Sequence, residues 1–298
     1  MNLDPNQYLN EGYCVFRNVL SPLEMKKNQN ILNGMIRRLQ PGEKPQFMFE
    51  PHVGSRHWKF WLELARHPKI LDSVESVLGP NLILILSHFI IKGTEDKMTV
   101  GWHQDQRYWT KGVIGDDLCT VWMPFVKVNQ NNGCMKIIPK SNQSYVRKDS
   151  KVLEDDGTTI TQFEVAVSKD MEKNAVDIAI NPGDFSIHSG FVIHGSEPNL
   201  SKRMRKIYTM RYANSFTTKF SAENWHIPFF LVRGESPGKS FYIDLRPDKA
   251  LPSEQPNCTL VNNIKSGKDN KILLKIFILM YLMMVINITI LVQNNSST

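Results

Sequence analysis

The residues best suited to chemistry lie close together in the segment 101–106, which reads GWHQDQ. If this segment is extended, His103 and Asp105 are two positions apart and project from the same face of a strand. An imidazole and a carboxylate placed side by side can take neighbouring positions on one metal ion. The alternative is a hydrogen bond between the two side chains, and a single His-x-Asp pair taken alone favours that alternative.

A second segment, His194-Gly195-Ser196, lies far along the chain and changes this weighing. A ligand so distant in sequence suits a jelly roll, because remote strands of that fold converge inside one barrel. Two histidines and one carboxylate make the facial triad of non-haem Fe(II) oxygenases, which leaves other positions on the iron open. His188 is the competing third ligand. We prefer His194 because glycine and serine follow it, as expected for a turn at the barrel mouth.

The basic segment 199–206, which reads NLSKRMRK, comes shortly after this histidine. An alternating stretch begins at Arg205, which shares one face with Ile207 and Thr209. An arginine directed into a barrel needs an anion, because burying it unpaired costs free energy. A dicarboxylate cosubstrate would supply that anion to the guanidinium fork. A surface position in a basic turn is the alternative, and it is the better interpretation for Arg203 and the lysines of the segment.

Local patterns predict helices first and strands afterwards. A capping box from Ser21 to Glu24 predicts a helix over residues 22–39, and a second helical pattern covers 58–78. Short apolar runs then predict strands at 82–86, 118–128, 135–138, 176–180, 184–188 and 205–212. This order favours a mainly β fold: a double-stranded β-helix, the cupin-like jelly roll, with N-terminal helices packed on the barrel.

Several short motifs occur in an order that is more specific than any one of them. They are His103-x-Asp105, Asn131-Asn132-Gly133-Cys134, Pro139, Gly183-Asp184 and His194-Gly195-Ser196 with Arg205, preceded by Gly12-Tyr13. Together they resemble the phytanoyl-CoA dioxygenase (PhyH) family of Fe(II)- and 2-oxoglutarate-dependent oxygenases, over residues 8–213. The resemblance implies Fe(II) as the metal, with 2-oxoglutarate and O2 as cosubstrates. It also implies hydroxylation of an unactivated carbon of a small-molecule or acyl substrate, with release of succinate and CO2.

The resemblance assigns the iron ligands residue by residue. It implies that His103, Asp105 and His194 bind iron. Related halogenases lack the carboxylate ligand and hold chloride in its place, so the presence of Asp105 favours hydroxylation. One turn departs from the family pattern, because the usual Pro-Gly-Ser-His reads PKSN at 139–142.

For 2-oxoglutarate, the resemblance implies that Arg205 grips the far carboxylate, with Arg203 as the fallback. Ser196 and Trp122 match positions that contact 2-oxoglutarate in the family, although Trp122 could equally be part of the core. Two other interpretations stay open: a non-catalytic, cupin-like metal sensor or pseudoenzyme, and a membrane-tethered interaction protein with a vestigial pocket. Arg205 argues against a sensor, which has no need of a clamp for 2-oxoglutarate.

The composition bounds these expectations. The chain has 298 residues, of which 41% are hydrophobic and 22% charged, enough for a sizeable core and unlike a disordered or collagen-like protein. Its net charge of +7 could draw in anionic small molecules but does not indicate a nucleic-acid partner. The four cysteines form no CxxC pair and are expected to be reduced, buried thiols. Neither the substrate nor the oligomeric state can be read from these features.

We divide the chain into a jelly-roll dioxygenase domain at 1–250, a polar linker at 251–271 and a hydrophobic C-terminal tail at 272–298. The tail contains a 17-residue apolar stretch at 276–292, which follows several lysines and is at the lower limit for crossing a bilayer. Two interpretations stand: an anchor that tethers the protein to a membrane with its catalytic domain in the cytosol, or an appendage that packs on the protein. The N-terminus lacks the pattern of a signal peptide, so a cytoplasmic location is expected.

Overall fold

The computed structural model describes residues 5–256 except for positions 42, 44, 46–47, 49–50, 95–97, 110–111, 116, 144–150, 153–158, 160, 162, 221–226 and 238–241. The chain divides into two units, Met1–Gln255 and Pro256–Thr298, and of the second only Pro256 is described. The predicted tail and most of the predicted linker therefore lie outside the described residues, and the domain division stays a prediction. Within the described part of the chain, no helix has the length and apolar character to cross a membrane.

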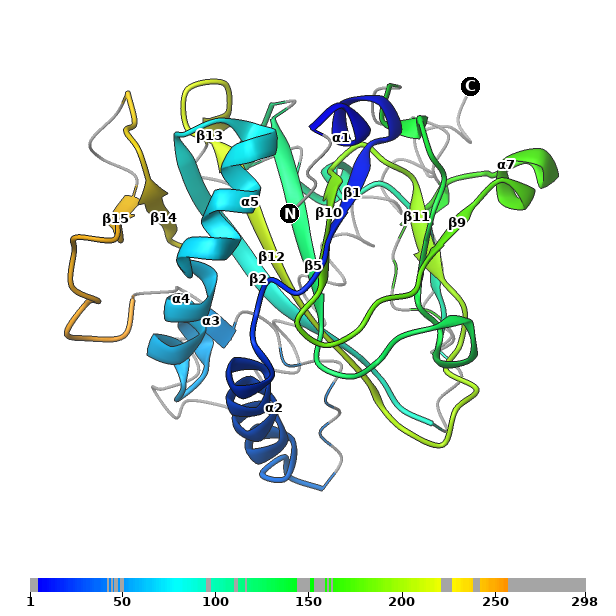
Figure 1. Ribbon diagram of the computed structural model, residues 1–298, viewed down its shortest axis with the longest axis horizontal. Coiled ribbons are helices and arrows are strands. Elements are labelled where there is room, and N and C mark those ends of the chain that lie inside the picture. The colour runs from blue at the N-terminus through cyan, green and yellow to red at the C-terminus, as the bar shows by residue number, and fades with distance from the viewer. Residues whose placement is uncertain are drawn as a thin grey trace, which may run out of the picture. The chain divides into compact units, whose positions relative to one another are not determined.

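Two larger sheets form the frame of the molecule (Figure 1). The first has the order β1 (Tyr13–Phe16), β10 (Phe185–Ser189), β5 (Leu118–Pro124), β12 (Arg205–Asn214), β2 (Leu82–Lys92), β14 (Phe229–Arg233) and β15 (Tyr242–Asp244). The second has the order β3 (Val100–His103), β11 (His194–Ser196), β6 (Met135–Ile137) and β9 (Val176–Ile178). Two short pairs complete the strands: β13 (Lys219–Phe220) with β4 (Val113–Ile114), and β7 (Lys151–Val152) with β8 (Phe163–Glu164).

The pairing confirms the predicted fold class. Neighbouring strands of the two larger sheets are antiparallel except for β14 and β15, and one cavity takes its lining from both sheets. The fold is therefore mainly β and has the two-sheet arrangement of a jelly roll, although the large sheet does not close into a barrel. All six predicted strands are present, with ends that differ by a few residues, and β2 runs on as far as Lys92.

Short helices connect and cover the strands. They are α1 (Pro5–Glu11), α2 (Pro22–Ile36), α3 (Pro51–Gly54), α4 (Trp58–Ala65), α5 (Pro68–Leu78), α6 (Gln106–Trp109) and α7 (Lys169–Lys173), with 3-10 turns at Gln130–Asn132 and Ser141–Gln143. The capping box of α2 is present as predicted: the amide of Ser21 donates to the Glu24 carboxylate at 2.7 Å, and the amide of Glu24 donates to Ser21 Oγ. The helix ends at Ile36, slightly before the predicted end.

The single helix predicted over residues 58–78 is wrong, because the structure has two helices there. α4 ends at Ala65, and α5 begins at Pro68. Proline has no amide hydrogen and disfavours a helical conformation in the residue before it, and His67 accordingly has an extended ψ of 129°. α5 ends where the sequence predicted, at Leu78, and is capped by Gly79, whose φ is +81°.

The N-terminal helices cover the outer face of the large sheet. α3 packs on β2, and α5 packs on β5 and β12 (Figure 1). Trp61 of α4 is fully buried against Phe89 and Tyr208, with ring centroids 4.9 and 5.2 Å away. Tyr212 donates its hydroxyl hydrogen to the backbone oxygen of Ala65 at 2.6 Å. These contacts bury the outer face under aromatic side chains and leave the inner face to line the cavity.

The Gly183-Asp184 motif has a structural role at the start of β10. Gly183 has a φ of +97°, and a side chain on it would meet the backbone oxygen of Leu20 at 2.6 Å. The Asp184 carboxylate accepts hydrogen bonds from the amides of Asn18 and Asn181 at 2.8 and 3.0 Å. The motif therefore ties the β1–α2 connection to the strand that carries His188.

Three of the four cysteines test the prediction of reduced, buried thiols. Cys14, Cys119 and Cys134 are free and buried. Burial raises the pKa of the Cys134 thiol to about 12, so it stays protonated at neutral pH. The prediction is confirmed for these three, and Cys258 lies outside the described residues.

Candidate functional site

The structure brings the three predicted ligand side chains to one point in the cavity between the sheets. His103 ends β3 and is the direct register partner of His194, which opens β11. Asp105 Oδ1 lies 3.7 Å from His103 Nε2 and 3.9 Å from His194 Nε2. One ligand atom from each residue lies within 4.8 Å of the other two. Side chains distant in sequence therefore converge as a jelly roll allows.

The prediction that Asp105 lies beside His103 on one face of a strand is wrong. The strand ends at His103, and Asp105 lies in the turn that precedes α6 rather than on the same strand face. The amide of Tyr108 donates to the backbone oxygen of Asp105 at 3.0 Å, which closes this turn. Gln104 and Gln106 donate side-chain hydrogens to the backbone oxygens of Phe191 and Val113 at 2.6 and 3.0 Å. Both glutamines thus hold the turn in place, and neither belongs to the three-residue group.

Backbone carbonyls orient both imidazoles. His103 Nδ1 lies 2.8 Å from the backbone oxygen of Gly101, and His194 Nδ1 lies 3.0 Å from that of Val192. A carbonyl oxygen can only accept, so each Nδ1 carries the hydrogen and each Nε2 presents a lone pair toward Asp105. Burial and then the charges of nearby imidazoles lower the pKa of His194 well below its usual value. The neutral form is the one that binds metal.

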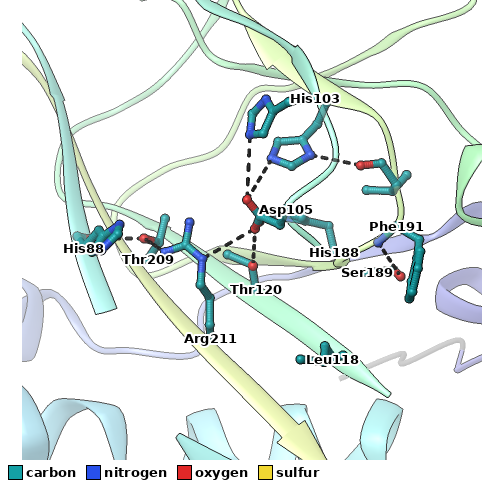
Figure 2. Close-up of polar contacts among 12 residues, drawn as sticks. His88, His103, Asp105, Leu118, Thr120, His188, Ser189, Phe191, Thr209 and Arg211 are labelled. Carbon is teal, nitrogen blue, oxygen red and sulfur yellow. Dashed lines mark hydrogen bonds and ion pairs between the residues drawn. The ribbon is translucent and has the colours of Figure 1, made fainter. Parts of the chain in front are cut away.

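The two carboxylate oxygens of Asp105 have different neighbours: Oδ1 lies near the two imidazoles described above, and Oδ2 is held by other residues. Thr120 donates its hydroxyl hydrogen to Asp105 Oδ2 at 2.6 Å, and Arg211 Nε and His188 Nε2 each lie 3.6 Å from the same oxygen. Figure 2 shows Arg211 and Thr120 on the opposite side of Asp105 from His103. Burial alone would raise the pKa of Asp105, but Arg211 and the imidazoles outweigh it and hold the pKa well below its usual range. The carboxylate is therefore ionised.

This donor set fits a small divalent cation. The distances of 3.7 and 3.9 Å between the Asp105 oxygen and the histidine nitrogens exceed those of hydrogen bonds, so a plain His–Asp hydrogen bond does not explain the arrangement. Two neutral imidazoles and one carboxylate are the donors of the non-haem iron facial triad. All three residues are at most 7% exposed.

A buried arginine occupies another part of the same cavity. Arg205 is 1% exposed and donates from Nη1 to the backbone oxygen of Gly133 at 2.6 Å and to Ser196 Oγ at 3.3 Å. Its Nε has no hydrogen-bond partner, and it forms no ion pair, among the described residues. Burial lowers the pKa of Arg205 to about 9, so the group is still charged at neutral pH. A buried cation in this state fits a carboxylate ligand.

The Asn-Asn-Gly motif shapes the acceptor for this arginine. Gly133 has a φ of +70°, and a side chain on it would meet the backbone oxygen of Glu197 at 2.3 Å. Only glycine fits there, and its own carbonyl then points to Arg205. Trp122 lies with its ring centroid 6.0 Å from the guanidinium carbon.

Of the predicted site residues, six line one cavity and one does not. The six are His103, Asp105, Trp122, His194, Ser196 and Arg205. Arg203, the fallback, is exposed and lines a separate surface depression away from this cavity. His188 also lines the cavity but is not part of the three-residue group.

Sequence reasoning missed three cavity or near-cavity residues. Lys92 is 1% exposed, is the register partner of Arg205, and donates to Ser196 Oγ at 2.8 Å. Thr120 and Arg211 approach Asp105 as described above. Arg211 lies an even number of residues after Arg205 on the same strand, so alternation predicts that both side chains face the cavity. The positions of Lys92 and Thr120 depend on how the strands pair.

Comparisons with known proteins agree with this fold. The family model described as "Phytanoyl-CoA dioxygenase (PhyH)" matches residues 8–207. The fold and the site define a jelly-roll protein with a His–Asp–His group in its cavity that could hold a metal ion. Because the match covers most of the chain, the protein belongs to the phytanoyl-CoA dioxygenase family, as the motifs indicated.

Individual relatives are distant. A zebrafish (Danio rerio) phytanoyl-CoA dioxygenase domain-containing protein 1 is 28% identical over 74% of this chain and 93% of its own length. A homologue from Caenorhabditis briggsae is 26% identical over 48% of this chain, and the chain spans about half the length of that relative. The solved non-heme monooxygenase ThoJ superposes with a TM-score of 0.66 at 22% identity, over 88% of this chain and 94% of that one. The last likeness concerns the fold alone.

Proposed function

We propose that the protein is an Fe(II)- and 2-oxoglutarate-dependent dioxygenase that hydroxylates an unactivated carbon of a small-molecule or acyl substrate. The observation that carries the proposal is a juxtaposition in one cavity: a convergent His–Asp–His group, and a buried arginine without a carboxylate partner among the described residues. The crystal structure of a protein with a similar fold, the epimerase SnoN, contains Fe3+ and alpha-ketoglutarate, which supports the same pairing of ligands here.

In this proposal His103, Asp105 and His194 hold the iron. Their Nε2 lone pairs and the Asp105 Oδ1 atom are already directed at a common point, so little reorganisation is needed on binding. Asp105 contributes a negative charge next to the metal. It fills the ligand position that a halide would need, which favours hydroxylation over halogenation.

Arg205 would receive the far carboxylate of 2-oxoglutarate, and Ser196 would donate its hydroxyl hydrogen to the same group. Lys92 holds Ser196 through its hydroxyl and backbone oxygens, at 2.8 and 3.0 Å. Trp122 would border the bound cosubstrate and keep water away from it. When bound, Fe(II), 2-oxoglutarate and O2 supply the oxidising chemistry, with succinate and CO2 as the products of the cosubstrate.

The binding test uses absorption spectroscopy without oxygen. Anaerobic protein with Fe(II) and 2-oxoglutarate should develop a weak visible charge-transfer band. Asp105→Ala should abolish the band and lower metal affinity by about a hundredfold or more, because it removes a direct ligand. Arg205→Met should raise the dissociation constant of 2-oxoglutarate about a hundredfold while iron affinity changes little. The exposed Arg203→Gln variant is the matched control and should behave as wild type.

Succinate formation in air then separates an enzyme from a sensor. The iron-loaded protein should release succinate from 2-oxoglutarate slowly by itself and faster when a substrate is supplied from a metabolite library. Metal binding without any effect of 2-oxoglutarate would instead identify a non-catalytic metal-binding protein. A band that survives Asp105→Ala would remove that residue from the ligand set.

A further inference from the structure

The cavity holds more buried positive charge than its own carboxylate neutralises. Arg205 and Arg211 are 1% and 7% exposed, whereas Asp105 is the one carboxylate among the described residues that line the cavity. Iron as Fe(II) and 2-oxoglutarate as a dianion would add equal and opposite charges, so both together leave this excess unchanged. A buried charge without a counterion costs free energy. The loaded site is therefore expected to attract one more anionic group.

Arg211 is the cation that the proposed cosubstrate does not use. It lies six residues after Arg205 on β12, a separation of roughly 20 Å along an extended strand. Its Nη1 donates to Thr209 Oγ1 at 2.9 Å, and its guanidinium lies 5.4 Å from the ring centroid of Trp109. Its Nε has no hydrogen-bond partner among the described residues. This end of the cavity therefore carries a separate, incompletely satisfied cation.

Orienting Asp105 is not a sufficient explanation for Arg211. Thr120 already fixes Asp105 Oδ2 with a hydrogen bond of 2.6 Å. Arg211 Nε stays 3.6 Å from that oxygen, which is beyond hydrogen-bond distance and leaves its donor unused. The guanidinium fork is built for two parallel hydrogen bonds to an oxyanion, and this contact supplies neither.

His188 provides a second, independent sign of a missing ligand. It comes from a different strand, β10, is 1% exposed and lines the same cavity. Neither of its ring nitrogens has a hydrogen-bond partner in the described part of the chain, and its Nε2 lies 3.6 Å from Asp105 Oδ2. Leaving a buried polar group unsatisfied costs free energy, so native structures usually provide a partner. Figure 2 shows His188 and Arg211 both beside Asp105.

We propose that Arg211 and His188 form a subsite that binds a carboxylate group of the substrate. The guanidinium supplies charge and paired donors, and the imidazole supplies a further N–H from the neighbouring strand. Arg211 lies on the opposite side of Asp105 from His103 (Figure 2), and the His188 ring centroid lies 4.5 Å from that of His194. A carboxylate held by these two residues would lie beside the His103, Asp105 and His194 group and leave Arg205 to the cosubstrate. This inference rests on the proposed function and specifies its substrate as an acid.

Matched pairs of acids and amides test the subsite without turnover. The protein is loaded with Ni(II) and saturating 2-oxoglutarate, which blocks Arg205, and is titrated with hexanoate against hexanamide and benzoate against benzamide. Calorimetry or ligand-observed NMR gives the dissociation constants. We expect the carboxylates to bind about tenfold more tightly than the amides of the same shape. The preference should fall to about onefold in Arg211→Gln and should be reduced in His188→Leu.

Two control variants separate recognition of the anion from effects on Asp105 and on overall charge. Thr120→Val removes the group that fixes Asp105 Oδ2 but no charge, so it should weaken metal binding and keep the preference for acids. Lys202→Gln removes an exposed positive charge and should change neither metal binding nor the preference for acids. If Arg211→Gln does not fold or load metal, Arg211→Lys keeps a charge without the fork and should retain a weaker preference.

Equal binding of acids and amides by the wild-type protein would overturn the proposal, as would an undiminished preference in Arg211→Gln or, where that variant does not load, in Arg211→Lys. Failure of the proposed function would look different. In that case the protein would not bind 2-oxoglutarate or release succinate, and the loading step of this experiment would reveal it before any probe is added.

Discussion

The two faces of strands β2 and β12 differ in how well their buried side chains are packed and paired. On the outer face, Phe89 and Tyr208 pack against Trp61, and Tyr212 finds a backbone acceptor in α4. On the inner face of the same strands, charged groups such as Arg205 lack full partners. Successive residues of a strand point to opposite sides, so one stretch of chain contributes to stability on one face and to chemistry on the other.

The comparison shows where the free energy of folding comes from and where it is lost. Buried aromatic rings contribute favourable transfer and packing energy on the outer face. Buried cations without carboxylate partners oppose folding on the inner face. A site that is ready for an anion is destabilising until that anion arrives, which is the usual relation between function and stability. Substitutions on the two faces should therefore change stability in opposite directions.

The largest effect on stability is expected from the outer face. Trp61→Ala should lower the free energy of unfolding by about 3–5 kcal/mol, because it leaves a large cavity among fully buried rings. Urea denaturation measures the loss, and the folded fraction should bind metal and 2-oxoglutarate as wild type does. Leu23→Ala, which truncates a side chain that is 78% exposed, is the control and should change stability little. A large drop in metal affinity in folded Trp61→Ala would show that the two faces are coupled.

Removing the inner-face cation Arg205 should raise the free energy of unfolding, the opposite of the effect expected for Trp61→Ala. Burial lowers the folded-state pKa of Arg205 to about 9, well below its ordinary value, so the unfolded chain holds the proton more tightly and the charge opposes folding at neutral pH. Arg205→Met should therefore raise the free energy of unfolding of the ligand-free protein by about 1–4 kcal/mol, while 2-oxoglutarate binding is lost. Arg203→Met, on the surface, should change neither the free energy of unfolding nor the binding of 2-oxoglutarate. Destabilisation by Arg205→Met would mean that its bonds to Gly133 and Ser196 outweigh the cost of burial.

Much of the fold was predictable because its signals are local. The capping box at Ser21, the period-two strands and the end of α5 at Gly79 depend on neighbouring residues and appear where the sequence placed them. The helix predicted across Pro68 is wrong because proline interrupts the helix although the apolar periodicity continues through it. Local chemistry was the better guide there.

The candidate site was predictable in its members and less so in its geometry. The motifs brought His103, Asp105, His194 and Arg205 to attention, but the expected strand placement of Asp105 was wrong. The contact between Thr120 and Asp105 depends on how β5 and the turn before α6 lie in space, which no short motif encodes. Register between paired strands is a property of the whole sheet, so such neighbours become visible only in the structure.

A buried histidine on the outer side should make stability sensitive to acid. His52 is fully buried, its Nδ1 lies 2.7 Å from Ser87 Oγ, and burial lowers its pKa to about 3. As pH falls below the unfolded value of 6.5 toward 3, the unfolded chain takes up a proton that the folded chain refuses. Stability contributed by this group is thus intact above pH 6.5 and falls by about 1.4 kcal/mol per pH unit below it.

Urea denaturation at pH 7.5, 6.0 and 5.0 measures this slope. His52→Gln should reduce the slope by about 1.4 kcal/mol per pH unit below pH 6, whatever it does to absolute stability. His57→Gln, at a partly exposed position, is the matched control and should leave most of the slope in place. An unchanged slope in His52→Gln would assign the acid sensitivity to the inner-face histidines instead.

The smallest effect is expected at a strained turn near the inner face. Lys140 has a φ of +68°, in the left-handed region where side chains are disfavoured, at the position where the family usually has glycine. Its Nζ lies 3.7 Å from Glu11, but the lysine side chain is 67% exposed, so this pair contributes little. Lys140→Gly should raise the free energy of unfolding by about 1 kcal/mol. Asn18→Gly, at a φ of +54°, should change stability less, because asparagine tolerates this conformation.

The same turn contacts the chain next to His194 through one hydrogen bond. The amide of Ile193, directly before His194, donates to Ser141 Oγ at 2.8 Å. Relief of strain at Lys140 leaves that serine in place, so Lys140→Gly should keep wild-type metal affinity while it gains stability. A titration with Fe(II) beside the urea curve measures both quantities. If metal affinity falls instead, the strained turn sets the position of β11, the strand that carries His194. Stability and metal binding would then be coupled at this turn.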